Sequence, residues 1–121
     1  MQIAQKNFYK KLLGRAGEIK AAEYLKKNDY KIAEKNYRTH IGEIDIIAEK
    51  DGVTVFIEVK TRTDDEFGCG AEAVNAKKRE KYVLTAKEYL MRTGKTDSPC
   101  RFDVVEIQGG KINHIENAFC E

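Results

Sequence analysis

The sequence predicts an α/β fold in which a mixed β-sheet is flanked by helices, in the order α-β-β-β-α-β-β. Two long segments, at about 8–27 and 71–91, space their apolar and charged residues with helical periodicity. Between them, two runs rich in β-branched residues surround an Asp-Gly pair, as the strands of a hairpin do. The second helical segment is long enough for a crossover, so the strands before and after it are predicted to be parallel.

The first helical segment carries small residues along one side, which would let another element approach closely. A glutamate, Glu18, lies among them, so its carboxylate is predicted to point toward the packed side of the helix. The stripe consists of Gly14, Gly17, Glu18, Ala21, Ala22 and Leu25.

Turn signals separate the remaining elements. Asn28-Asp29 ends the first helix, Asp51-Gly52 joins the hairpin strands, and Gly109-Gly110 joins the last two strands. The polar segment 61–70 is predicted to be a loop. The predicted strands are 30–37, 43–49, 53–60, 101–107 and 111–115.

The bulk composition fits one domain that spans residues 1–121. Hydrophobic residues make up 41% and charged residues 35%, which favours a globular chain over a disordered one. The net charge of +2 neither requires nor excludes a nucleic-acid partner. No run of about 18 apolar residues is present, and the three cysteines form no CxxC pair. We therefore expect a cytoplasmic protein with reduced cysteines and no membrane association.

The hairpin brings charged residues into an unusual register. A two-residue turn at Asp51-Gly52 pairs residues whose numbers sum to 103. Asp45 then faces Glu58 at a Cβ separation of roughly 4.5–5.5 Å, where like charges repel. Glu43 likewise faces Lys60. A divalent metal between the carboxylates would explain why the chain tolerates them. The opposite face is predicted to be apolar and consists of Ile44, Ile46, Val55, Ile57 and Val59.

These residue types at this spacing suit metal-dependent cleavage of a phosphodiester bond, which needs an activated water and stabilisation of transition-state charge. Mg²⁺, or Mn²⁺ in its place, is held by carboxylate oxygens and retains several waters. Asp45 and Glu58 are the candidate ligands, with the carbonyl of Val59 as a third. Lys60 would orient or deprotonate the attacking water or stabilise developing charge. Glu18 would complete the site through a water ligand.

Each of these side chains also has an ordinary interpretation. An exposed Glu-x-Lys tripeptide usually belongs to a solvated strand face, and a single carboxylate such as Glu18 to a helix surface. Glu43 opposite Lys60 could form a cross-strand ion pair of little energetic weight. The opposed Asp45 in a hairpin of fixed register is the observation that favours the metal site.

Short motifs are spread along residues 14–119. They are Gly14-Arg15-Ala16-Gly17-Glu18, Asn36-Tyr37-Arg38, Gly42-Glu43-Ile44-Asp45-Ile46-Ile47-Ala48, Phe56-Ile57-Glu58-Val59-Lys60-Thr61-Arg62, Phe67-Gly68, Ala73-Val74, Lys77-Lys78, Arg101-Phe102-Asp103-Val104-Val105 and Asn117-Ala118-Phe119. With these motifs together in this order, the chain resembles the YraN-like family of uncharacterised bacterial proteins.

The resemblance implies a restriction-endonuclease-like core, whose hairpin carries the PD-(D/E)xK nuclease motif. Asp45 takes the place of the motif's aspartate, although Ile44 stands where the motif has proline. Glu58 and Lys60 match the (D/E)xK half. Glu18 matches the helix glutamate of the similar archaeal Holliday junction resolvases.

Basic residues near the predicted site are candidates for contact with a phosphate backbone, although an exposed basic face is often only solvated. Arg62 follows the (D/E)xK half, and Arg15 lies on the first helix. No recognition-helix or zinc-finger pattern is present, so shape is favoured over base sequence as the recognised feature. Asp103 is predicted to be a structural partner of Arg101 or Arg62, with a place at the edge of the site as the alternative. The second predicted helix supplies Lys77, Lys78, Arg79 and Lys81.

These features predict a Mg²⁺-dependent nuclease that acts on branched or structured DNA in repair or recombination. The alternative is a non-catalytic nucleic-acid-binding or adaptor protein that retains the nuclease fold, and an RNA-directed nuclease is a third option. The similar resolvases act as two-fold dimers, so the resemblance makes a homodimer an option, but the sequence shows no recognisable dimer seam.

Overall fold

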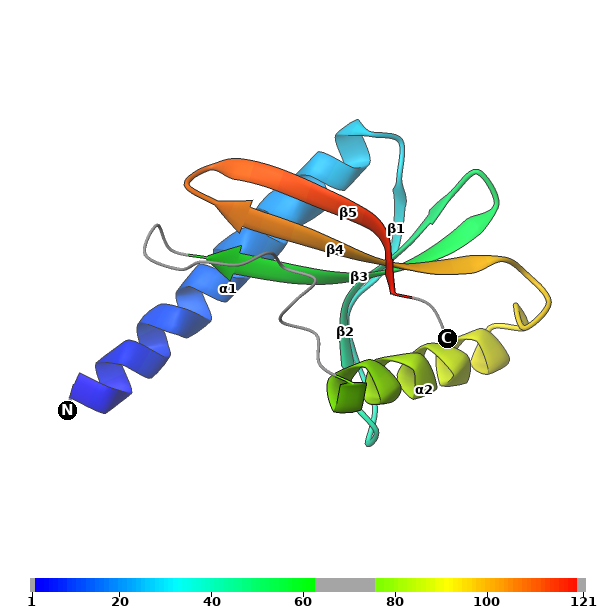
Figure 1. Ribbon diagram of the computed structural model, residues 1–121, viewed down its shortest axis with the longest axis horizontal. Helices are drawn as coiled ribbons and strands as arrows, with labels where there is room; N and C mark the ends of the chain where they lie inside the picture. Colours follow the sequence, from blue (N-terminus) through cyan, green and yellow to red (C-terminus); the bar gives the residue numbers. More distant parts are fainter. Residues whose placement is uncertain (1, 63–75, 120–121) are drawn as a thin grey trace.

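A five-stranded sheet, with its strands in the order β1-β2-β3-β4-β5, organises the structure. The computed structural model describes the backbone of residues 2–62 and 76–119 and the side chains of residues 12–62 and 76–118. The order of elements confirms the predicted mixed sheet with flanking helices (Figure 1). The elements are α1 (Gln2–Lys27), β1 (Lys31–Arg38), β2 (Glu43–Lys50), β3 (Val53–Arg62), α2 (Ala76–Arg92), β4 (Cys100–Gln108) and β5 (Lys111–Phe119).

The hairpin of β2 and β3 begins in the predicted register. Asp51 and Gly52 both have positive φ, 51° and 80°, as a two-residue type I′ turn requires. The antiparallel pairing runs from Lys50–Val53 to Ile46–Ile57, and the residue numbers of every pair sum to 103. The turn therefore fixes which face of the sheet each paired residue occupies.

The parallel pairing of β3 with β4 confirms the predicted crossover through α2. β3 continues to Arg62, which pairs with Gln108, whereas the sequence predicted a loop from residue 61. The strand is extended because Arg62 Nε donates a hydrogen bond of 2.8 Å to Glu106 Oε2 on β4, and both side chains are nearly buried.

The last strand is also longer than predicted. β5 pairs with β4 as far as Phe119 and does not end at residue 115. Residues 63–75, which include the start of the predicted second helix and most of the predicted polar loop, lie outside the described residues.

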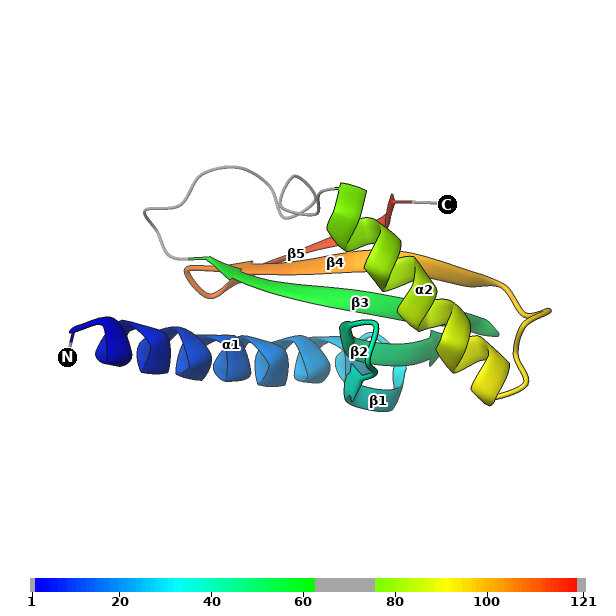
Figure 2. The same cartoon turned by 90° about the horizontal axis from the view of Figure 1, so that it is seen from below.

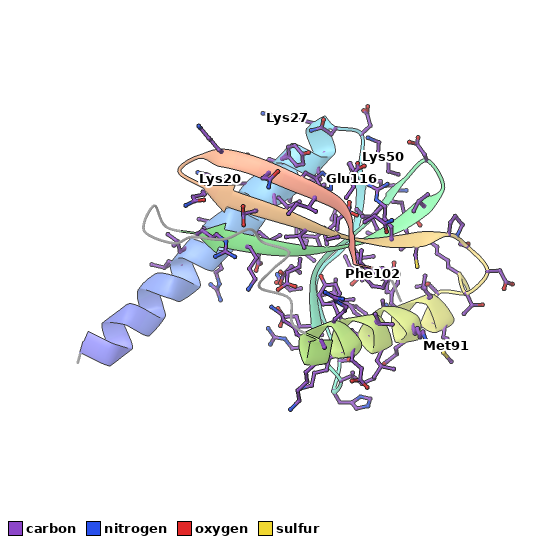
Figure 3. The ribbon with its side chains drawn as sticks, viewed as in Figure 1. Lys20, Lys27, Lys50, Met91, Phe102 and Glu116 are labelled. Atoms are coloured by element: carbon purple, nitrogen blue, oxygen red, sulfur yellow. The ribbon has the colours of Figure 1, made fainter. Side chains whose placement is uncertain are left out.

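The two helices cover opposite faces of the sheet (Figures 1 and 2). α1 packs Ala21, Ala22 and Leu25 against one face. α2 packs against the other, where Phe102 of β4 lies between sheet and helix, while Met91, 70% exposed, points away from the sheet (Figure 3). Because both faces are covered, the central strands are buried almost continuously. Neither helix in the described part of the chain is long and apolar enough to span a membrane.

α1 meets β3 at a close contact between Gly17 and Thr61. A Cβ atom on Gly17 would lie 1.9 Å from Thr61 Oγ1 and 3.3 Å from Thr61 Cβ, so the contact requires glycine. The predicted small-residue stripe is therefore the packed side of α1 at Gly17. Gly14 is an exception, because no atom lies within 4 Å of the position that its Cβ would take.

Replacement of Gly17 by alanine is expected to lower the free energy of unfolding by about 1–3 kcal/mol, because the added methyl group overpacks the contact with Thr61. Gly14→Ala is the matched control on the same helix, and it is expected to stabilise the protein by up to about 1 kcal/mol through helix propensity. Urea denaturation measures both values. Adding Thr61→Ala to Gly17→Ala removes the clashing hydroxyl and is expected to recover most of the loss. Equal stability of the two single variants would contradict the close contact.

Both edge strands of the sheet are interrupted. In β1, the pairing with β2 shifts between Ile32 and Glu34, and Asn36 has a φ of 52°. In β5, the shift in pairing with β4 falls at residues 116–118, where Asn117 has a φ of 53°. Asparagine adopts this left-handed conformation more readily than most residues, and in β5 Asn117 lies within the shift itself.

A buried polar network surrounds Asp103, which is fully buried. Its carboxylate accepts hydrogen bonds from Arg101 Nε at 3.0 Å, His114 Nε2 at 2.7 Å and the backbone N–H of Asn117 at 3.0 Å. Burial would raise the pKa of Asp103, but these hydrogen bonds outweigh it and lower the pKa. A hydrogen bond of 2.9 Å between Tyr24 Oη and His114 Nδ1 joins α1 to the network. The predicted structural pairing of Asp103 with Arg101 is confirmed.

Candidate active site

β2 and β3 stop pairing at the predicted site. The last paired residues are Ile46 and Ile57, so Asp45 and Glu58 are not the direct cross-strand partners that the sequence predicted. Asp45 Oδ2 instead accepts a hydrogen bond of 2.9 Å from the backbone N–H of Val59. The departure from the ladder avoids the direct opposition of two carboxylates, which would repel each other.

Two further predictions for this hairpin are wrong. The register of β2 and β3 contains no Glu43–Lys60 pair, and Glu43 Oε2 accepts a hydrogen bond of 2.8 Å from Arg38 Nε on β1. Ile44 packs in the cluster on the α2 side of the sheet, not on the α1 side. Both differences arise at residues 43–45, where β2 no longer pairs with β3 but still pairs with β1. Side chains alternate strictly between the two faces only along a regular strand.

Glu58 is a buried carboxylate with one unpaired oxygen. It is 4% exposed on β3. Its Oε1 contacts the ammonium of Lys78 from α2 and lies 3.8 Å from Lys60 Nζ. Its Oε2 is buried, and no donor from the described residues reaches it. Because a buried oxygen without a partner costs free energy, a cation at this oxygen would stabilise the site.

Asp45 carries a strongly perturbed carboxyl group. Burial raises its pKa from 3.8 to about 7, and the negative charges of Glu18 and Glu58 add to this effect. The hydrogen bond from Val59 opposes the shift but does not cancel it. A pKa this high shows that burial and the neighbouring carboxylates disfavour the charge of Asp45, and carboxyl groups of this kind concentrate at functional sites.

The Gly17 contact places Glu18 near the same carboxylates. Burial raises the pKa of Glu18, and a hydrogen bond from the Asn36 side chain partly opposes the shift. The charge of Glu18 in turn raises the pKa of Asp45. Glu18 of α1 and Glu58 of β3 are therefore both within electrostatic reach of Asp45 on β2.

Two lysines beside Glu58 differ in their electrostatic surroundings. Burial, together with the neighbouring Lys78, lowers the pKa of Lys60, whose side chain is 29% exposed. Burial also disfavours the charge of Lys78, but its contact with Glu58 outweighs burial and raises the pKa of Lys78. Lys60 is thus the lysine better able to release a proton, and Lys78 is the more persistent cation.

The predicted phosphate-binding residues fall into two groups. Lys77 and Lys81 are exposed on α2, and Arg15 is exposed on α1, so their charges can reach a polyanion. Arg79 is half-buried on α2. The structure does not bring Arg62 to this exposed group, because its guanidinium is held in the nearly buried ion pair on β4.

Carboxylate oxygens such as those of Asp45 and Glu58 are the donors that hard divalent cations prefer. Within residues 12–62 and 76–118, no three His, Cys, Asp or Glu side chains gather closely enough to enclose an ion, which gives no support to a closed zinc site. Mg²⁺ is commonly held by one or two carboxylates and keeps several waters. The observations that bear on such a pair are the buried Oε2 of Glu58, which no donor from the described residues reaches, and the raised pKa of Asp45.

Sequence comparison places the chain in a family. The profile of the uncharacterised protein family UPF0102 matches residues 17–107. The chain belongs to UPF0102. Three relatives, all UPF0102 proteins, match nearly full length. That of Sulfurihydrogenibium sp. is 47% identical over 106 residues, covering 88% of this chain and 92% of the relative. That of Alkaliphilus oremlandii is 48% identical over 115 residues (90% and 98%), and that of Caldanaerobacter subterraneus is 44% identical over 121 residues (94% and 99%).

The family match confirms the YraN-like resemblance seen in the sequence motifs. The matched UPF0102 segment contains all four residues of the predicted catalytic set and also Lys78, whereas Arg15 precedes it.

Two residues at this UPF0102 site have roles that the sequence did not reveal. Lys78 was predicted only as a phosphate contact, and nothing in a helical lysine run shows which member turns inward. Asn36 lies in β1 with positive φ and interacts with Glu18. A signal for Asn36 was present, because an asparagine inside a strand is a candidate for a left-handed position.

An apolar hollow of about 440 Å³ lies elsewhere on the UPF0102 chain. Its lining includes Val83, Leu90 and Met91 of α2 and Phe102 of β4. Hollows of this kind are usual sites for small molecules. None of the three candidate carboxylates lines it, so it is separate from the candidate active site.

Proposed function

We propose that this chain is a Mg²⁺-dependent nuclease of the restriction-endonuclease-like type, which cleaves phosphodiester bonds in branched or structured DNA. The observation that carries the proposal is the buried, unpaired Oε2 of Glu58 beside the high-pKa carboxyl group of Asp45. A fold that only used these residues as surface charges would leave them hydrated. The burial of Glu58 Oε2 without a donor from the described residues is explained when a cation binds there.

Asp45, Glu58 and the carbonyl oxygen of Val59 would hold the metal, with Glu18 reaching it through a water. A bound Mg²⁺ at such a site lowers the pKa of a coordinated water and neutralises charge on the phosphate. The hydrogen bond from the Val59 N–H to Asp45 Oδ2 fixes the orientation of the carboxylate, so that its second oxygen remains for the ion.

Lys60 and the exposed basic residues supply the remaining functions. The lowered pKa of Lys60 suits it to take a proton from the attacking water, or to stabilise negative charge on the phosphate while protonated. Arg15, Lys77 and Lys81 would contact the phosphates that flank the cleaved bond, since their side chains are exposed on the two helices. Binding through such contacts should weaken steeply as salt increases.

The test is cleavage of branched, flapped and linear DNA, with RNA of the same sequences in parallel, in Mg²⁺, Mn²⁺ or EDTA. We expect metal-dependent cleavage that favours branched DNA. Glu58→Gln is expected to reduce the rate at least about 100-fold, because the carboxylate oxygen that would bind the ion is lost. Asp97→Asn, an exposed carboxylate in the turn before β4, is the matched control and should keep the wild-type rate. Cleavage that persists in EDTA or in Glu58→Gln would refute the assigned site.

A non-catalytic nucleic-acid-binding protein is the second candidate. The contact of Lys78 with Glu58 favours it, because an ammonium already neutralises part of the site without any metal. This alternative predicts salt-sensitive DNA binding that is unchanged by EDTA, with no turnover on any substrate. Calorimetric titration with Mn²⁺ separates the two candidates, since the nuclease site binds the ion and the binding module does not.

A further inference from the structure

Two ammonium groups approach the same oxygen of Glu58 from different elements. Lys60 follows it by two residues on β3, and its Nζ lies 3.8 Å from Glu58 Oε1. Lys78 comes from the first turn of α2, and its Nζ is in direct contact with that oxygen. The helix lysine, not the lysine of the Glu-x-Lys tripeptide, is therefore the primary ion-pair partner of Glu58.

This pairing meets an electrostatic need of the metal-free protein. The side chain of Glu58 is only 6% exposed, and its charge lies close enough to Asp45 to raise the pKa of that carboxyl group. An ionised carboxylate buried among other acids is unfavourable unless a cation accompanies it. Lys78 supplies that charge, while its own side chain is 42% exposed and so retains a path to solvent.

The same position cannot suit both cations. A divalent ion held by Glu58 and Asp45 would place two positive charges beside the Lys78 ammonium, and their repulsion would be strong because the site is largely shielded from water. The Lys78 ammonium can move into solvent by rotation about the bonds of its flexible side chain. Lys60 belongs to the strand itself, is less exposed and already lies farther from the oxygen.

We propose that Lys78 is the resident counter-ion of Glu58, which a divalent cation must displace in order to bind. The proposal rests on the metal site of the proposed function. Once displaced, the Lys78 ammonium lies at the rim of the site, on the same helix as Lys77 and Lys81. There it can donate hydrogen bonds to a substrate phosphate. Lys78 is thus a positioning residue that couples metal loading to exposure of a phosphate-binding charge.

Calorimetric titration with Mn²⁺ at pH 8 tests this exchange. Lys78→Gln removes the competing charge and is expected to lower the Kd for Mn²⁺ about tenfold. Lys77→Gln, an exposed neighbour on the same turn, is expected to leave the Kd unchanged, and Lys78→Arg is expected to keep it near the wild-type value. An unchanged or higher Kd in Lys78→Gln would overturn the proposal, since a merely supporting lysine would not compete with the ion.

A double-mutant cycle in EDTA separates this inference from the proposed function. Lys78→Gln and Glu58→Gln are each expected to change the melting temperature, and the double variant should differ from the sum of the single changes because the two groups form one ion pair. If the wild-type protein binds no Mn²⁺, the metal site fails. Coupling in the cycle would then still support Lys78 as the counter-ion of Glu58, and additive effects would overturn that role as well.

Discussion

Asp45→Asn is expected to abolish metal binding and metal-dependent cleavage, and at the same time to make the metal-free protein more stable above pH 7. Asparagine keeps an oxygen that can accept the hydrogen bond from the Val59 N–H, so the local backbone contact survives. It removes the negative charge that burial and the neighbouring carboxylates disfavour. Loss of function and gain of stability should therefore occur together, as expected for a site whose charges are arranged for a ligand.

The gain in stability depends on pH in a defined direction. The carboxyl group of Asp45 releases its proton near pH 3.8 in the unfolded chain and near pH 7 in the folded protein. Protonation of Asp45 adds to the free energy of unfolding, because the folded protein binds this proton more tightly than the unfolded chain does. This contribution is complete below pH 3.8 and is lost as the pH rises to about 7. The advantage of Asp45→Asn should therefore grow across this interval and level off above pH 7, at about 2–4 kcal/mol.

Urea denaturation in EDTA at pH 4, 6 and 8 measures this advantage. Addition of Mg²⁺ at pH 8 should stabilise the wild-type protein and leave the variant unchanged, which narrows the difference between them. Asp97→Asn serves as the control for loss of an exposed carboxylate and should have little effect at any pH. A variant less stable than wild type at pH 8 in EDTA would mean that the fold stabilises the Asp45 charge, and would contradict the raised pKa of this carboxyl group.

Asp103→Asn is expected to have the opposite effect, lowering the free energy of unfolding by about 3–5 kcal/mol at neutral pH. Asp103 is fully buried, and its pKa is lowered because hydrogen bonds from His114, Arg101 and the Asn117 backbone outweigh burial. The stability that its charge supplies is present above the unfolded pKa and is lost as the pH falls through the lower folded pKa. Without the charge, the Arg101 guanidinium loses its buried partner.

Glu116→Gln is the matched control for this prediction. Glu116 also pairs with Arg101, at 3.4 Å, but its side chain is 61% exposed. Its replacement should therefore cost no more than about 1 kcal/mol. Chemical denaturation at pH 7 compares the two variants, and a similar loss in both would show that the buried network contributes no more than a surface ion pair.

The sequence predicted most of the fold because a few local signals constrain it. The Asp51-Gly52 turn fixed the register of the hairpin, and the length of the segment between β3 and β4 required a crossover. Gly17 in the small-residue stripe marked the place where α1 approaches the sheet. These signals act over short stretches of chain or through steric size, so they can be read without tertiary information.

The site was only partly predictable, because the position of each charged side chain depends on which of several hydrogen-bond or ion-pair partners it contacts in the folded protein. The register set by the turn predicts Asp45 opposite Glu58. In the structure, the Asp45 carboxylate accepts a hydrogen bond from the Val59 N–H, and the pairing of β2 with β3 ends at Ile46 and Ile57. Ile44 packs on the α2 side of the sheet, whereas strict alternation along β2 predicts the α1 side. The inward turn of Lys78 follows from the buried charge of Glu58, which no helical pattern in α2 reveals.

The asparagines on the two edge strands have a consequence for how the protein behaves at high concentration. An uninterrupted edge strand presents free N–H and C=O groups to other molecules and is a common starting point for amyloid-like aggregation. Asn36 and Asn117, with the shifts in pairing on their strands, break both edges into short stretches. Neither edge offers a long, straight template for another chain. Copies of the protein that meet in a crowded cell are therefore expected to associate through faces other than the sheet edges, and fibril formation should be slow.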